Sequence, residues 1–293
     1  MTIREEYEAF LKNRQVCTAD PLFCRFLNQA ERYITPFRVY GKIYYVGDTW
    51  VCAYLVDTGR GLLLIDGGNC GDAAKLIDNI WRLGFDPAKI RWMVVSHGHV
   101  DHFGVANYLK TVYDTKLFMG APDAEMLKKE PELTLIQNSN DLSEIIPEVD
   151  VPIHDCDEIN FGNLKARFRL VPGHTDGSIA MFFDMEEDGV IRHVGYYGGL
   201  GLNTMEREYL LQRGDPNCEK RKEYLQSIES VRDEAVDVVL GNHTEHGDVL
   251  DKRKRQLAGY YGNPFIDPTD WNRLLDEWSE KMKALMRSEN QPL

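Results

Sequence analysis

Three histidines and an aspartate lie together in one short stretch, Ser96-His97-Gly98-His99-Val100-Asp101-His102. Neutral imidazole and carboxylate groups are the ligands that a borderline divalent ion such as zinc takes from proteins. The chain has only 8 histidines in 293 residues, so a chance cluster in a polar loop explains this density poorly. We interpret the stretch as a metal-binding loop.

The apolar run at residues 93–95, directly before this loop, is typical of a short buried strand, and small residues at its end allow a sharp turn. On such a turn His97 and His99 can point toward one position. Asp101 and His102 then reach past them toward a second. The spacing therefore indicates two neighbouring metal positions, and one loop cannot supply all the ligands of both.

Two other loops share the setting of strand, glycine and histidine. They are Pro172-Gly173-His174 and Gly241-Asn242-His243, and each follows an apolar run. Loops that follow strands can converge at one edge of packed sheets, where a rigid scaffold commonly holds metal ligands and catalytic groups. We therefore expect His174 and His243 to complete the site.

The remaining histidines are weaker candidates. His246 lies three positions after His243 and competes with it for the same role. His154 and His193 have no comparable setting, so we predict that they are structural or exposed.

Periodic apolar patterns predict two similar halves in which helices separate strands. The predicted strands cover residues 39–45, 51–56, 62–65, 91–95, 164–170, 179–183, 190–197 and 236–240, and the predicted helices cover residues 72–83, 218–231 and 269–287, with one more beginning near residue 103. Such an order suggests an α/β fold of two packed sheets with helices outside. We predict a helical N-terminal extension over residues 1–36 and one domain over residues 37–293.

These motifs resemble those of the metallo-β-lactamase superfamily, whose marker is a His-x-His-x-Asp-His loop. The resemblance implies a four-layer αβ/βα sandwich of two mixed sheets with outer helices. It implies a first zinc held by His97, His99 and His174, and a second held by Asp101, His102 and His243. Asp66, in the segment Leu62-Leu63-Leu64-Ile65-Asp66-Gly67-Gly68, would orient a ligand histidine, as carboxylates around metal sites commonly do.

The sequence resembles one branch of this superfamily in particular. Most of its hydrolases carry an aspartate that bridges both metals, but here residues 195–201 read Gly-Tyr-Tyr-Gly-Gly-Leu-Gly. Loss of the bridge is typical of the true β-lactamases, and histidine rather than cysteine on the second metal points to the third subclass of class B. Residues 198–203 and 263–268 are similar to that subclass, whereas Gly199 stands where the subclass commonly has a serine.

The resemblance implies a dinuclear zinc-dependent hydrolase in which a metal-bound hydroxide attacks a carbonyl. Asp101 would orient the nucleophile and relay its proton. A β-lactam, which is a cyclic amide, is the leading small-molecule substrate. The alternatives are a lactone or thioester hydrolase, a non-catalytic metal-binding protein, and a mononuclear iron dioxygenase.

Composition limits the kinds of molecule that we expect this protein to bind. The net charge of −13 argues against binding to nucleic acid or to an anionic membrane. No apolar run approaches the length of a membrane span, and the charged N-terminus lacks the apolar core of a secretory signal. We expect a cytoplasmic protein, unless a leader was removed. The six cysteines show no zinc-ribbon or redox spacing, although a Cys17–Cys24 disulfide is an open alternative.

Overall fold

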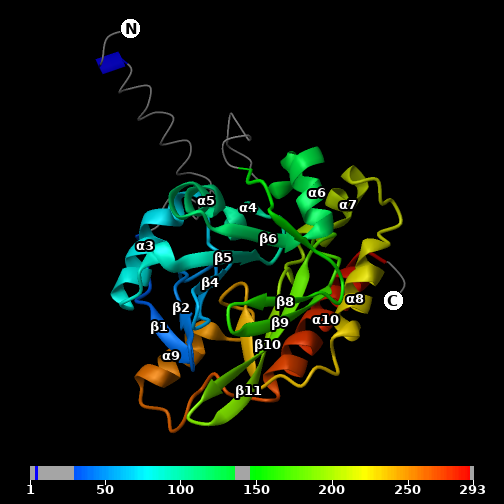
Figure 1. Ribbon diagram of the computed structural model, residues 1–293. Helices are drawn as coiled ribbons and strands as arrows, with labels where there is room; N and C mark the ends of the chain where they lie inside the picture. Colours follow the sequence, from blue (N-terminus) through cyan, green and yellow to red (C-terminus); the bar gives the residue numbers. More distant parts are fainter. Residues whose placement is uncertain (1–3, 6–29, 136–145, 291–293) are drawn as a thin grey trace.

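The computed structural model describes residues 4–5, 30–135 and 146–290 (Figure 1). Most of the predicted helical extension over residues 1–36 lies outside these residues, and so does the Cys17–Cys24 pair. Within the described part, two β-sheets face each other and helices cover their outer faces.

The first sheet has seven strands in sequential order. They are β1 (Phe37–Tyr40), β2 (Ile43–Tyr45), β3 (Tyr54–Asp57), β4 (Leu62–Ile65), β5 (Ile90–Val95), β6 (Lys116–Gly120) and β7 (Val151–Ile153). Strands β1 to β4 form an antiparallel meander, and β4 to β7 run parallel, so the sheet is mixed. The segment 39–45, predicted as one strand, is divided by a turn at Gly41, whose φ of +50° suits glycine.

The second sheet has five strands in the order β12-β11-β10-β9-β8. They are β8 (Glu158–Phe161), β9 (Leu164–Leu170), β10 (Ile179–Glu187), β11 (Val190–Tyr197) and β12 (Val238–Gly241). Only the β11–β12 pair is parallel. The strand predicted for residues 164–170 is present as β9, and along most of it apolar and charged side chains face opposite sides.

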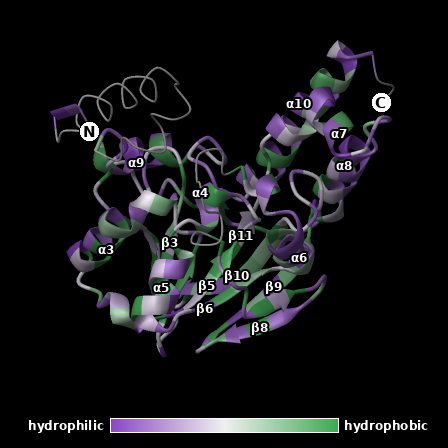
Figure 2. Cartoon of the chain, turned by 90° about the horizontal axis from the view of Figure 1, so that it is seen from above, coloured by the Kyte–Doolittle hydropathy of each residue, from purple (hydrophilic) through white to green (hydrophobic). Residues whose placement is uncertain are grey.

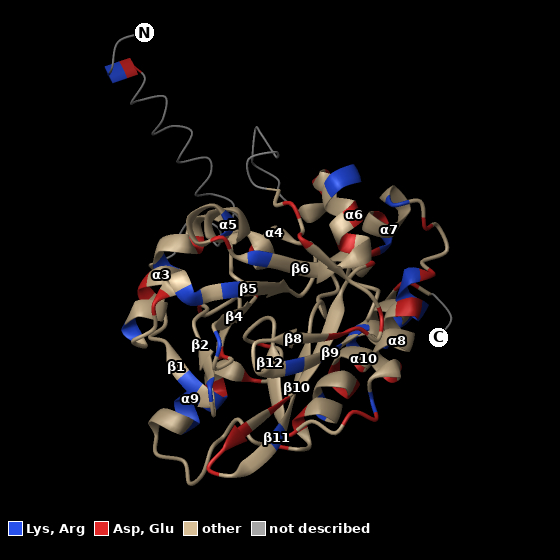
Figure 3. Ribbon diagram, in the orientation of Figure 1, with Lys and Arg blue, Asp and Glu red and all other residues tan. Residues whose placement is uncertain are grey.

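Helices form the two outer layers. Those of the first half are α3 (Ala73–Arg82), α4 (Val100–Phe103), α5 (Ala106–Tyr113) and α6 (Ala121–Lys129), and those of the second half are α7 (Arg207–Gln212), α8 (Lys220–Ser230), α9 (Val249–Leu257) and α10 (Asp270–Ser288). Short 3₁₀ turns lie at Cys70–Asp72, Pro87–Lys89, Pro131–Thr134 and Asn203–Met205. Many of the charged residues lie on these helices (Figure 3). Among the described residues, no helix is both long enough and apolar enough to cross a membrane.

Strand β10 contributes apolar side chains to two layers of the molecule. Ile179, Met181 and Phe183 belong to the apolar layer between the sheets, whereas Ala180 and Phe182 belong to the layer under α8 and α10. Successive side chains of a strand point to opposite faces, so a strand that is apolar on both faces is buried from both sides. The apolar strands accordingly lie in the middle of the molecule (Figure 2). The predicted α/β sandwich of two mixed sheets with outer helices is confirmed.

The histidine loops lie where the two sheets meet. The amide of Ile179, in the second sheet, donates to the carbonyl of Ser96 in the first (3.0 Å), and the amide of Gly198 donates to the carbonyl of Ile179 (2.9 Å). Val51 forms an isolated bridge with His243. The first two bonds join the segment after β5, the start of β10 and the end of β11, and the bridge joins the loop after β12 to the segment between β2 and β3.

The stability of the outer layer can be tested at Trp271 on α10, which is buried and donates from Nε1 to the carbonyl of Val231 (2.9 Å). Replacing Trp271 with alanine should lower the free energy of unfolding by about 3–5 kcal/mol, because it leaves a cavity against the second sheet. Urea unfolding followed by circular dichroism measures this loss. As a control, Trp81 on α3 is 57% exposed, and Trp81→Ala should change stability by only about 0.5 kcal/mol. Equal losses in the two variants would contradict this assignment.

Candidate metal centre

The first cluster consists of His97, His99 and His174. One ligand atom from each lies within 4.8 Å of those of the others, and all three rings are buried. His97 and His99 follow β5 in the first sheet, whereas His174 follows β9 in the second. Each pair of ring centroids is 4.6 Å apart. The structure therefore brings together the residues predicted for the first metal.

The second cluster consists of Asp101, His102 and His243, whose ligand atoms also lie within 4.8 Å of one another. Asp101 Oδ2 is 3.6 Å from His102 Nε2 and 3.5 Å from His243 Nε2. The predicted helix start near residue 103 is wrong, because α4 begins at Val100 and carries Asp101 and His102 on its single turn. The rings of His97 and His102 are 4.2 Å apart, so the two clusters are neighbours.

Hydrogen bonds at Nδ1 determine which ring nitrogen is free. Carbonyl oxygens accept from Nδ1 of His174 (Gly201, 2.7 Å) and of His243 (Trp50, 3.2 Å), and Asp66 accepts from Nδ1 of His102 (2.7 Å). Because a carbonyl oxygen only accepts, the proton is on Nδ1 and the lone pair is on Nε2. This arrangement is the usual one for metal-ligating histidines.

Among the described residues, ring nitrogens that carry no proton either face one another or lack a hydrogen-bond partner. His97 Nε2 and His99 Nδ1 lie 3.0 Å apart and approach the same point. Nε2 of His102, in the second cluster, is buried without a hydrogen-bond partner. Burying an unpaired polar atom is costly, whereas a cation placed between these lone pairs would satisfy them. The donor set therefore fits a pair of divalent ions.

Burial keeps most of these rings neutral. It lowers the pKa of His97 and His99 well below the ordinary value and the pKa of His174 to about 4, and it also lowers the pKa of His243. His102 differs: burial lowers its pKa, but Asp101 and Asp66 raise it more, and the net pKa lies above the ordinary value. Neutral imidazole is the form that binds a metal.

Asp66 is the hub of a buried network. Its Oδ2 accepts from Ser96 Oγ (2.8 Å), from His102 Nδ1 and from the hydroxyl of Tyr196, and its Oδ1 accepts from the Ser96 amide (2.8 Å). Ser96 Oγ in turn lies 3.0 Å from His97 Nδ1. The predicted contact between Asp66 and a candidate ligand ring is thus present in the structure.

The other histidines lie outside both clusters. His246 is buried and bonds through Nδ1 to Asn242, and its ring packs edge-on against Trp278, so His243 rather than His246 faces Asp101. His154 and His193 are largely exposed and lie beside aspartates, in agreement with the prediction.

Residues 196–201 contribute no side-chain ligand to either cluster. Tyr196 faces Asp66 in the layer between the sheets, while Tyr197 lies in the layer under α10, so neither lines the cavity beside the clusters. Gly199 has a φ of +82°, and a Cβ at this position would lie 3.1 Å from the His174 ring. At Gly198 and Gly199 the backbone therefore lies in close contact with the histidine loops.

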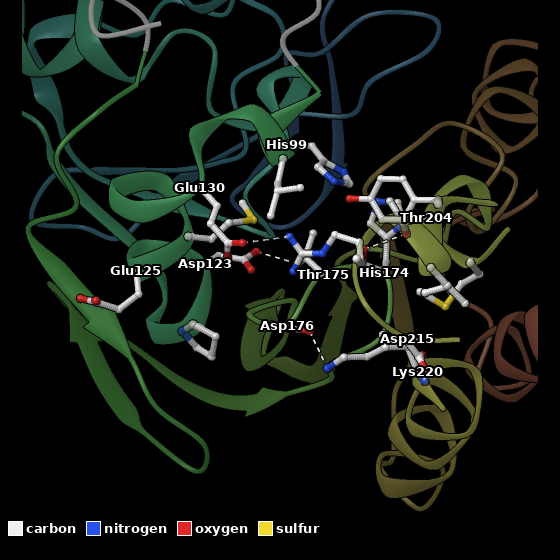
Figure 4. A pocket seen from close by; sticks show the side chains of 18 of the residues that line it. His99, Asp123, Glu125, Glu130, His174, Thr175, Asp176, Thr204, Asp215 and Lys220 are labelled. Carbon is white, nitrogen blue, oxygen red and sulfur yellow. Dashed lines mark hydrogen bonds and ion pairs between the residues drawn. The ribbon is translucent and has the colours of Figure 1, made fainter. Parts of the chain in front are cut away.

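A cavity of about 190 Å³ lies beside the first cluster (Figure 4). Its walls come from α6, the loop after β9 and α7, and they include His99, Asp123, Met126, His174, Tyr209 and Arg213. Cations in the wall are matched by acids, such as Lys220 with Asp176 at 2.7 Å. Asp123 carries no distinctive signal in the sequence, because a single acid in the first turn of a helix is ordinary.

Comparisons with known proteins agree with this geometry. Residues 51–191, which carry the loops of His97 and His174, match the model of the metallo-beta-lactamase superfamily. The hydroxyacylglutathione hydrolase GloC of Haemophilus influenzae is 25% identical over 161 residues, which cover 53% of this chain and 71% of that protein.

Two solved structures show the same fold. The subclass B3 metallo-beta-lactamase BJP-1 of Bradyrhizobium japonicum matches with a TM-score of 0.74 at 22% identity, over 88% of this chain and 96% of that one. The class B3 di-zinc enzyme LRA-12, from an Alaskan soil metagenome, matches with a TM-score of 0.74 at 22% identity, over 87% of this chain and 95% of that one. Residues 51–191 are thus similar to the metallo-β-lactamase superfamily, and the two-sheet fold of this chain is the fold of these solved structures.

Proposed function

We propose that this protein is a dinuclear zinc hydrolase that opens a cyclic amide, with a β-lactam as its leading substrate. The observation that carries the proposal is the pair of adjacent clusters in which Asp101 is the one carboxylate among the described ligands. Structural zinc sites are usually closed and rich in cysteine, whereas these clusters contain no cysteine and the first of them borders a cavity. A catalytic role is therefore favoured over a purely structural one.

The end of β11 supports the β-lactamase assignment within the superfamily. An acid that bridges both metals would be expected one strand after the loop of His174, where this chain has Gly198 and Gly199. A Cβ on Gly198 would lie 2.5 Å from the side chain of Ser96, so this backbone leaves no room for a carboxylate. The ligand set is then the set of five histidines and one aspartate expected for the third subclass.

When bound, two zinc ions can lower the pKa of a shared water toward about 7 and polarise a carbonyl group. Asp101 Oδ2 can accept the proton of the attacking water and pass it to the departing nitrogen. Its side chain is 14% exposed, so it remains accessible from the substrate side. Asp66 holds His102 in place, and the cavity beside His99 and His174 offers space for the part of the substrate that does not react.

A thioester hydrolase is the second candidate. The relative named hydroxyacylglutathione hydrolase matches about half of this chain at 25% identity. The same metal chemistry cleaves a thioester, because only the leaving atom differs.

The second cluster can be tested by Asp101→Ala and His102→Ala. Each should lower kcat by about 100-fold or more, because each removes a ligand and Asp101→Ala also removes the proton acceptor. His193→Ala is the control, since His193 is exposed and pairs with Asp184 on β10. Zinc content and turnover are measured on the same samples. Full activity with an empty second cluster would rule out the dinuclear mechanism.

The substrate can be identified with a panel of a cephalosporin, a homoserine lactone and an acylglutathione thioester, assayed on protein with measured zinc and iron content. We expect the highest kcat/KM for the cephalosporin. A higher value for the thioester would favour the second candidate, and stoichiometric iron with oxygen consumption would favour a dioxygenase. Chelation should remove activity with little unfolding, whereas unfolding on chelation would indicate a structural metal.

Acidification should release the metal of the second cluster before that of the first. A proton competes with a metal for each imidazole, and the raised pKa of His102 makes this competition effective at a higher pH than at His97, His99 and His174, whose pKa values are lowered. Cobalt bound to the apoprotein should leave in two steps as the pH falls from about 8 to 5. The visible spectrum of the bound cobalt follows this release. The earlier step should be missing in His102→Ala. Loss of the first cluster's metal at the higher pH would contradict the assignment.

A further inference from the structure

Asp123 is a buried carboxylate that belongs to neither cluster but contacts both loops of the first. Its Oδ2 accepts from the amide of Gly98 (2.6 Å) and from Thr175 Oγ1 (2.6 Å), and its Oδ1 accepts from the amide of Gly177 (2.7 Å). Gly98 lies between His97 and His99, and Thr175 follows His174. One side chain therefore joins the two segments that carry the first cluster (Figure 4).

These segments come from different sheets. The loop of Gly98 follows β5 in the first sheet, and the loop of Thr175 and Gly177 joins β9 to β10 in the second. Asp123 lies in the first turn of α6, which directly follows β6 of the first sheet. Its bonds thus cross from one half of the fold to the other, beside the point where the three rings meet.

The backbone around Asp123 lies very close to the loop that contains Gly177. A Cβ on Gly177 would lie 2.4 Å from the amide nitrogen of Asp123, and a Cβ on Gly120 would lie 2.0 Å from the carbonyl oxygen of Gly177. Real Cβ atoms do not approach that closely, so any larger residue at either position would push α6 away from the loop. The carboxylate has three donors and is fully buried, so it cannot exchange them for water without the two loops separating.

Asp66 and Asp123 therefore act in different ways. Asp66 bonds directly to the ring of His102. Asp123 touches no ring in the hydrogen bonds given above and acts through the backbone on either side of His97, His99 and His174. Ligand separation sets the affinity of a metal site, and outer partners of the ligands tune it.

We propose that Asp123 is a positioning residue that holds His174 at the correct separation from His97 and His99 for the first metal. This inference rests on the proposed metal site but on no particular substrate. It is tested by metal binding in the absence of substrate, so a loss of substrate contacts in the cavity cannot imitate the effect.

Two background variants isolate the clusters. His102→Ala leaves the first cluster complete, and His97→Ala leaves the second complete. Apoprotein of each background is titrated with Co²⁺ alone, with and without Asp123→Asn. We expect Asp123→Asn to raise the Kd for Co²⁺ about 10-fold or more in the first background and less than about 3-fold in the second.

Asp150→Asn is the matched control. Asp150 also accepts from a backbone amide, that of Leu117 (2.7 Å), and from Lys110, but it lies at the far end of β6 from the clusters. This control should leave both Co²⁺ affinities unchanged. An unchanged Kd in folded Asp123→Asn, or an equal loss in the two backgrounds, would overturn the proposal, because either result would mean that Asp123 has no specific effect on the first cluster.

Thr175 supplies a second test that does not depend on the folding of Asp123→Asn. Thr175→Val removes one of the hydrogen-bond donors to Asp123 and should weaken Co²⁺ binding in the His102→Ala background. Thr175→Ser keeps the hydroxyl and should bind Co²⁺ as tightly as the His102→Ala background itself. Equal affinities for the two variants would count against the proposal. If the wild-type protein binds Co²⁺ at the first cluster but cleaves no substrate of the panel, the proposed function fails and the role of Asp123 can still be measured.

Discussion

The apolar layer between the two sheets determines whether the site exists, because each cluster takes its ligands from both halves of the chain. His97 and His102 belong to the loop after β5, whereas His174 and His243 follow strands of the second sheet. The distance between these groups is therefore set by how the inner faces of β4, β5, β10 and β12 pack. Close packing with few voids is what allows side chains from separate sheets to meet with the accuracy that metal ligation requires.

Polar contacts refine what this packing brings together. Around the second cluster, the Trp50 ring lies 5.6 Å from the ring of His243, and its carbonyl accepts from Nδ1 of His243. Asp48 fixes the turn that carries Trp50 by accepting from the Trp50 amide (2.8 Å), and Lys75 and Arg32 pair with Asp48 at 2.7 and 2.9 Å. A buried ion network therefore supports the loop beside His243. Such a network stays favourable only while every member keeps its partner.

Much of the fold and the membership of both clusters can be predicted from the sequence. The patterns are strong where they are local: residues 62–65 and 92–95 are continuous apolar runs, and residues 164–170 alternate. The loops of His174 and His243 share a setting with the first loop, so they too can be recognised. The metal-binding role of the clusters, in contrast, stays a prediction, as does the division at residue 36.

Other parts of the structure leave little trace in the sequence. Strand β7 has only three residues, and one of them is Pro152. Asp123 looks like an ordinary acid at the start of a helix, because its partners Gly98 and Gly177 are distant in the sequence and their amides carry no sequence signal. Tyr196 likewise becomes informative only when the second sheet places it against Asp66. Contacts of this kind depend on tertiary packing, which no local pattern encodes.

The two glycines at the end of β11 also limit what evolution can do with this scaffold. A side chain at Gly198 would collide with Ser96, and one at Gly199 would meet both Ser178 and His174 in a backbone conformation that suits glycine. No single substitution can therefore introduce an acidic group there while the surrounding loops stay where they are. An acid at the end of β11 would require a ligand loop to move first, and that movement would change the separation of the metal ligands.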